Sequence, residues 1–124
     1  MHTCALRIAV IGVLLVPLTY AQGPREAEFE RARNIVSKTM DDLRHVERHD
    51  QFAPEDRERY QRATRDLEDM RRDLDDHRLD RERLDRAIEE IERVARVDTV
   101  GERERRELMG DVRELRRLRD DWHY

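Results

Sequence analysis

Apolar side chains recur every three or four residues along most of this chain, which is the period of an amphipathic α-helix. The pattern predicts four helices, over about 25–49, 54–76, 81–97 and 100–124. No run of alternating apolar and polar residues predicts a β-strand, so the expected fold class is all-α. The residues expected to face inward are Phe29, Ala32, Val36, Met40, Leu43, Val46, Tyr60, Ala63, Leu67, Met70, Leu74, Leu84, Ile88, Ile91, Val94, Val97, Leu108, Val112, Leu115, Leu118 and Trp122.

The apolar pattern of the first half returns in the second half. When the sequence is shifted so that Val46 falls on Val94, apolar positions stay matched on both sides of the break near residues 50–53. We interpret the chain as two copies of one helical hairpin, over about 30–76 and 78–124.

Short connections make consecutive helices antiparallel neighbours, so the simplest assembly is two repeated antiparallel hairpins in an up-down-up-down four-helix bundle. Trp122 is expected to plug one end of its core. The alternative is a continuous helix across residues 77–80, which contain neither Gly nor Pro. That arrangement would give a long-helix hairpin that buries its stripe by dimerising.

Local signals mark the helix starts. Pro54 suits a first turn, where its missing N–H would be unpaired in any case. Asp80 can accept a backbone N–H at the start of the third helix. Thr99 and Glu102 have the spacing of a capping box.

Two further pairs of residues match in the same alignment of the two halves. Phe52 and Val100 precede the second helix of each hairpin and are predicted to be hydrophobic staples or protein-binding positions. Arg57 and Arg105 occupy matching first-turn positions and are expected to be exposed.

The segment 1–21 has the features of a secretory signal peptide. Arg7 precedes the apolar run Ile8–Leu18, and the small residue Ala21 suits cleavage. The apolar run is shorter than the roughly 20 residues of a spanning helix, so no membrane span is expected after cleavage. The mature chain, 22–124, is predicted to be one helical domain that is periplasmic or secreted.

Cleavage also changes the chemistry of the chain. It removes the only cysteine, Cys4, so stability must come from packing rather than from disulfides. It removes Arg7 as well, which takes the formal net charge from −4 to −5. Export and the lack of a strongly basic face argue against a nucleic-acid partner.

The mature chain offers little material for catalysis. Without cysteine, and with Ser37 as its only serine, it has few nucleophiles, and its glycines are too few for a phosphate-binding loop. Asp and Glu residues on helix faces rich in Arg are typical of solvated ion pairs. We therefore expect no enzymatic activity and no cofactor, apart from a candidate transition metal.

That candidate is a histidine pair. His45 and His49 lie one helical turn apart, and Asp41 or Asp42, a turn earlier, could add an oxygen ligand. Both imidazoles are placed about 180° or more from the apolar stripe by the helical period of about 100° per residue, so they are expected to face solvent. The predicted metal site is His45, His49 and Asp42.

The segments 52–56 and 100–104 resemble the helix-start motif of small exported bacterial proteins of the LTxxQ type. Their placement, spacing and acid content are similar, although the Thr and Gln of the motif are missing from both. That family includes periplasmic stress chaperones and heavy-metal resistance and sensor proteins. The resemblance implies a folding-helper activity, or metal sensing through the histidine pair.

Three functional hypotheses follow. The first is a non-enzymatic protein of the cell envelope with a stress-related helper role, which binds other proteins or itself through apolar surface along the concave side of the paired hairpins. The second is a metal-binding or metal-sensing periplasmic protein. The third is a structural envelope protein. His49→Ala should leave the first function intact and abolish the second.

Overall fold

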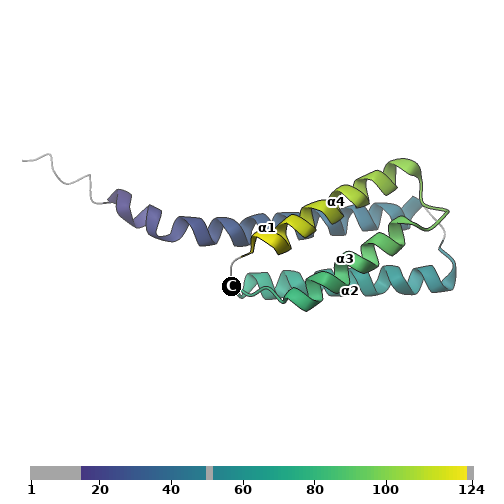
Figure 1. Cartoon of the computed structure of the whole chain (residues 1–124), viewed down its shortest axis with the longest axis horizontal. Helices are drawn as coiled ribbons and strands as arrows, with labels where there is room; N and C mark the ends of the chain where they lie inside the picture. The colour runs from purple at the N-terminus through teal and green to yellow at the C-terminus, as the bar shows by residue number, and fades with distance from the viewer. Residues whose placement is uncertain (1–14, 50–51, 123–124) are drawn as a thin grey trace, which may run out of the picture.

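The structure is a computed structural model that describes the backbone of residues 15–49 and 52–122, and the side chains of residues 25–48 and 52–122. It contains four α-helices in the described ranges, and their arrangement is shown in Figure 1. The helices are α1 (Leu15–His49), α2 (Pro54–Asp75), α3 (Arg81–Ala95) and α4 (Glu102–Asp121). The predicted all-α four-helix bundle is confirmed.

Each helix packs against two others, so the four helices close into a ring. Consecutive helices are neighbours, and α4 also packs against α1. Across the described residues, the diagonal pairs α1–α3 and α2–α4 make no such contact. The arrangement is that of an up-down bundle in which the apolar stripe of each helix faces a common core.

The core contains nearly every residue that the periodicity predicted. All the predicted inward positions are buried except Val97 and Trp122, which are partly buried and pack against the core. The prediction missed some buried positions, among them Ile35, Thr39 and Asp111. Thr39 is accommodated because its hydroxyl donates to the carbonyl of Ile35 at 2.8 Å.

The first helix begins earlier than predicted. It starts at Leu15 and includes Gly23 and Pro24, whereas the predicted helix began at about residue 25. Pro24 lies inside this helix, where a proline removes one backbone hydrogen bond and can kink the helix without ending it. In Figure 1 the beginning of α1 extends beyond the other three helices. No helix among the described residues combines the length and apolar character needed to cross a membrane.

A tight turn separates α2 from α3, so the alternative of one continuous helix across residues 77–80 is wrong. The N–H of His77 donates to the carbonyl of Leu74 at 3.0 Å, and the N–H of Arg78 donates to that of Asp73 at 2.8 Å. These two bonds form a Schellman motif, with His77 at the left-handed position (φ 59°) that glycine usually occupies. A pattern search for Gly or Pro therefore could not find this turn.

The helix starts agree with the sequence signals in two cases out of three. Pro54 is in the first turn of α2, and Asp80 caps α3 by accepting the N–H of Arg83 at 3.2 Å. The predicted capping box of Thr99 and Glu102 is wrong, because α4 begins at Glu102 with Gly101 as its N-cap. Thr99 lies two residues before this N-cap, and no side chain caps the helix.

Arg105 joins the end of α3 to the start of α4. Its guanidinium donates to the carbonyls of Ala95 at 2.7 Å, Val97 at 3.2 Å and Val100 at 3.3 Å. The expectation that Arg105 is exposed is therefore wrong, although its counterpart Arg57 is exposed as predicted. The last carbonyls of a helix lack partners within the helix, and an arginine can supply them.

Candidate functional site

A cleft of about 540 Å³ lies at the end of the bundle where α2 turns into α3 and α4 ends. Its volume falls within the range of about 300–1,000 Å³ that is typical of ligand pockets. Aromatic and apolar side chains share its lining with arginines and aspartates. The lining residues are Arg25, Phe29, Asp73, His77, Arg78, Leu79, Asp80, Arg83 and Trp122.

The aromatic part of the cleft is organised around Phe29. The ring of Phe29 meets His77 edge to face, with centroids 4.9 Å apart, and meets Trp122 in the same manner at 5.0 Å. Edge-to-face contacts are favourable because the positive ring edge meets the negative face. Trp122 directly follows the last residue of α4. Its side chain is partly buried against the core and also lines the cleft.

His77 connects the turn between α2 and α3 to the first helix. In addition to its contact with Phe29, its Nε2 lies 2.6 Å from Oε1 of Glu26 on α1. A left-handed backbone conformation costs a non-glycine residue about 1 kcal/mol or more. Here two side-chain contacts accompany that strained conformation, and they place the imidazole at the cleft.

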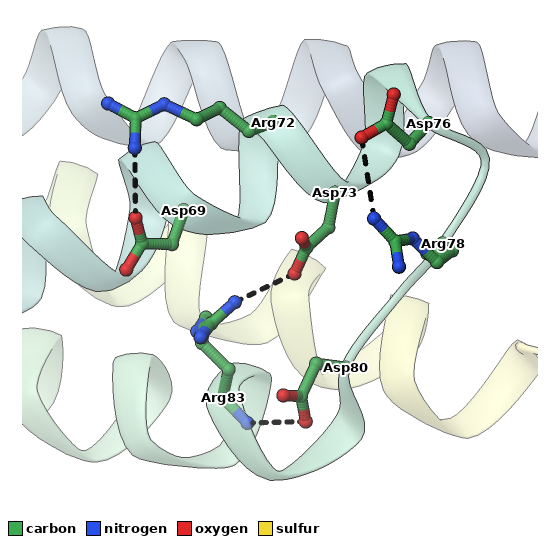
Figure 2. Close-up of polar contacts among 7 residues, drawn as sticks. All are labelled: Asp69, Arg72, Asp73, Asp76, Arg78, Asp80 and Arg83. Atoms are coloured by element: carbon green, nitrogen blue, oxygen red, sulfur yellow. Dashed lines mark hydrogen bonds and ion pairs between the residues drawn. The ribbon is translucent and has the colours of Figure 1, made fainter.

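Charged side chains line the α2–α3 side of the cleft, as Figure 2 shows. Nη1 of Arg83 donates to Oδ2 of Asp73 at 2.7 Å, which joins α3 to α2. Arg78 reaches Asp76 at 3.4 Å, and both side chains are exposed. The buried Nε of Arg83 has no acceptor among the described residues.

Of the three predicted metal residues, the structure describes the side chains of Asp42 and His45, so the metal site stays a prediction. Nε2 of His45 lies 3.6 Å from Oε1 of Glu104 on α4, so His45 lies beside a helix seam and its side chain, expected to face solvent, is 45% exposed. The reason is that α4 closes the ring on that side of α1. The side chain of His49 lies outside the described residues, and those described contain no group of three His, Cys, Asp or Glu arranged to hold a metal.

Asp42 belongs instead to a polar cluster between α1 and α4. Nζ of Lys38 lies 3.0 Å from Oδ2 of Asp42 and 2.8 Å from Oδ1 of Asp111. Burial, together with the neighbouring carboxyl of Asp42, raises the pKa of Asp111 to about 7. Burial also acts to raise the pKa of Asp42, but hydrogen bonds to Asp111 and Lys38 outweigh it and lower that pKa.

Sequence reasoning missed Asp111, which is only 1% exposed and has one carboxylate oxygen without a described partner. A signal was available: Asp111 lies three residues after Leu108 and four before Leu115, and thus on the apolar stripe of α4. The chain also has a single lysine, Lys38, on the helix that faces it. His77 and Arg83 were missed because the predicted break at residues 77–80 does not by itself specify the left-handed conformation of His77.

The predicted staple residues are both buried. Phe52 is 8% exposed and Val100 is 3% exposed, and each directly precedes the N-cap of the following helix. The ring of Phe52 stacks on Tyr60 at 5.7 Å, rather than on the fourth residue of α2, which is Arg57. Their burial leaves little surface at either residue for contact with another protein.

No family model, curated protein or solved structure matches this chain. The LTxxQ resemblance therefore stays a prediction from the sequence, and the functional argument depends on the structure of the bundle itself.

Proposed function

We propose that this chain is a non-enzymatic helical protein of the cell envelope that acts by binding other polypeptides. The observation that carries the proposal is the cleft at the end of the bundle, where Phe29, Leu79 and Trp122 line a surface hollow among arginine side chains. Partly exposed aromatic residues next to arginine are enriched at protein-binding surfaces. The helper role suggested by the LTxxQ resemblance is consistent with such a surface.

The location of the proposed contact differs from the one expected from sequence. We expected apolar surface along the concave side of the paired hairpins, but those stripes face one another within the ring and are buried. The partly exposed apolar side chains that remain packed against the core are Leu79, Val97, Met109 and Trp122, and two of them line the end cleft.

The two halves of the chain are proposed to be copies of one hairpin. Burial supports this: Leu67 and Leu115, which match in the alignment of the two halves, are both fully buried, and Phe52 and Val100 are both buried next to helix N-caps. The equivalence is not complete, because buried Asp111 corresponds to buried Ala63, and exposed Arg57 corresponds to part-buried Arg105. On this proposal the copies diverged where α4 closes the ring.

Export is proposed from the segment 1–21 alone. Cleavage after Ala21 would remove the first part of α1 and leave residues 22–24 as the start of the helix, next to Arg25 and the cleft. The mature protein would then present the cleft close to its own amino terminus.

A light-scattering experiment tests the helper function. A test protein unfolded in guanidinium chloride is diluted into buffer with and without the mature chain that begins at Gln22. We expect the mature chain to reduce scattering in proportion to its concentration, and Trp122→Ala to weaken the effect. Val97→Ala, which truncates a partly buried residue outside the cleft, is the matched control and should behave as the unmodified chain. Equal scattering with and without the mature chain would contradict a helper function.

The metal-binding alternative has one observation in its favour, since the carboxylate of Glu104 adds a donor beside His45. It predicts that Zn²⁺, Ni²⁺ or Cu²⁺ changes the sedimentation or helicity of the mature chain, and that His49→Ala removes the change. Sedimentation that is unchanged by metal would leave polypeptide binding or a structural role. The two remaining possibilities are separated by the scattering experiment.

A further inference from the structure

We infer that the end cleft binds an acidic, apolar peptide segment, in which an aromatic or large aliphatic side chain lies next to a carboxylate. The inference rests on the proposed function and names the chemistry of the polypeptide that the cleft would accept. Three features of the described side chains support it: the hydrogen-bonding groups left over at the rim, the exposed aromatic surface and the volume.

Most carboxylates at the cleft already have a donor. Asp73 accepts from the guanidinium of Arg83, Asp80 accepts the backbone N–H of the same residue, and Glu26 lies against His77. Carboxylates satisfied in this manner have less capacity to attract a cationic ligand. The cleft is therefore not a simple acidic site, although it contains two aspartates.

Two arginines at the cleft have few partners among the described residues. Arg25 is exposed and makes no ion pair or hydrogen bond within the described part of the chain. The side chain of Arg78 makes a single contact of 3.4 Å, with the exposed carboxylate of Asp76. Guanidinium groups bind carboxylates strongly because two parallel N–H bonds can form. The complementary ligand group is therefore a carboxylate.

The apolar lining sets the second requirement. Trp122 and Leu79 are only partly buried, and the Trp122 ring is held by Phe29 at 5.0 Å. A ligand that covered these side chains would remove apolar surface from water, which a bare anion such as phosphate cannot do. A cleft of about 540 Å³ has room for a short segment of chain rather than for a folded element.

The position of Trp122 makes the inference directly measurable. Trp122 is the only tryptophan of the chain, so intrinsic tryptophan fluorescence reports on the cleft alone. The mature chain is titrated with three capped tetrapeptides that differ at the two central positions: Ala-Phe-Glu-Ala, Ala-Phe-Gln-Ala and Ala-Ala-Glu-Ala. Inorganic phosphate is a fourth probe. We expect the Phe-Glu peptide to bind about tenfold more tightly than the other two peptides. The Phe-Gln peptide loses a charge-assisted hydrogen bond, and the Ala-Glu peptide loses the buried ring.

Arginine variants then locate the carboxylate. Arg25→Gln and Arg78→Gln each change an exposed side chain, so the fold should be kept. At least one of them should reduce the affinity for the Phe-Glu peptide about tenfold and leave the affinity for the Phe-Gln peptide unchanged. Arg71→Gln changes an exposed arginine of α2 that does not line the cleft, and it is the matched control.

Several results would overturn the inference. One is a fluorescence response to phosphate equal to that of the Phe-Glu peptide. Another is equal affinity for the Phe-Glu and Phe-Gln peptides. The third is a loss of affinity for the Phe-Glu peptide in Arg71→Gln as large as in the cleft variants. Sedimentation in the absence of peptide gives a further test, because a dimer that dissociates when the Phe-Glu peptide is added would show that a second copy fills the cleft. If the peptides fail while the mature chain still reduces light scattering, the peptide chemistry is wrong and the helper function stands. If both fail, both proposals are wrong.

Discussion

Lys38 on α1 and Asp111 on α4 form an ion pair of 2.8 Å between the first and last helices of the ring. Asp111 is almost completely buried, while Lys38 keeps its ammonium at the surface, so the pair lies across the edge of the core. Hydrogen bonding to Asp111 raises the pKa of Lys38 further above its ordinary range, against the effect of burial. The seam that closes the bundle therefore depends on the protonation of a buried carboxyl group.

The stability of the bundle is expected to depend on pH through Asp111. Its pKa in the folded chain is raised from 3.8 to about 7, so the folded state binds this proton more tightly than the unfolded state. The tighter binding of this proton stabilises the folded chain fully at pH values below 3.8, and the stabilisation is lost as the pH rises through about 7. The expected change in the free energy of unfolding across this interval is on the order of 4 kcal/mol.

Urea unfolding at a series of pH values from about 4.5 to about 8 would measure this effect. Asp111→Asn keeps the shape of the side chain without its titration, and it should flatten the decline in stability. Asp120→Asn, on the exposed end of α4, is the control and should leave the slope unchanged. A decline of the same size in Asp111→Asn and in the unmodified chain would rule out Asp111 as its origin.

Arg105 and Arg57 should differ in their effects on stability. Arg105→Ala removes three hydrogen bonds from carbonyls at the end of α3 and in the following loop, so it should cost about 2 kcal/mol. Arg57→Ala, at the matching exposed position of α2, should cost less than about 1 kcal/mol. Denaturant unfolding of the two variants gives the comparison directly, and equal losses would show that the carbonyl contacts do not stabilise the bundle.

The two central leucines should have similar effects. Leu67 and Leu115 are both fully buried, so Leu67→Ala and Leu115→Ala are each expected to lower the free energy of unfolding by about 2–5 kcal/mol. The loss combines reduced apolar burial with the cavity that remains. A cost below about 1 kcal/mol at either site, measured by denaturant unfolding, would remove the support that burial gives to the repeated hairpin.

His77 combines a strained backbone with favourable side-chain contacts, and two substitutions separate these effects. His77→Ala keeps the left-handed conformation at φ 59° but loses the contacts with Phe29 and Glu26. His77→Gly loses the same contacts and relieves the strain, so it should be about 1 kcal/mol more stable than His77→Ala. Thermal unfolding with both variants tests this order, and a glycine variant no more stable than the alanine variant would contradict it.

The periodicity of apolar residues predicted the four helices and most of the core, because a bundle buries one stripe of each helix. It could not predict which side of α1 would meet α4. As a result His45 was expected at a solvent face, and the approach of Lys38 and Asp42 to Asp111 was not foreseen. Such pairings depend on how the helices close into a ring, which the stripe of a single helix does not specify.

The candidate site was the least predictable part of the molecule. Trp122 was correctly placed at the end of the core, since its position follows from the stripe of α4. The rest of the cleft depends on the left-handed conformation of His77, a residue for which glycine is the usual choice. Arg83 is brought there by the turn and Arg25 by the packing of α1 against its neighbours, and their spacing in the sequence carries no corresponding signal.

The most direct test of polypeptide binding at the end cleft is the fluorescence of Trp122 during titration with an unfolded chain. With a reduced and carboxymethylated test protein that lacks tryptophan, Trp122 is the only tryptophan in the sample. We predict a saturable change in emission for the mature chain, with its helicity unchanged. Emission that stays constant throughout the titration, while the bundle remains folded, would contradict binding at the cleft.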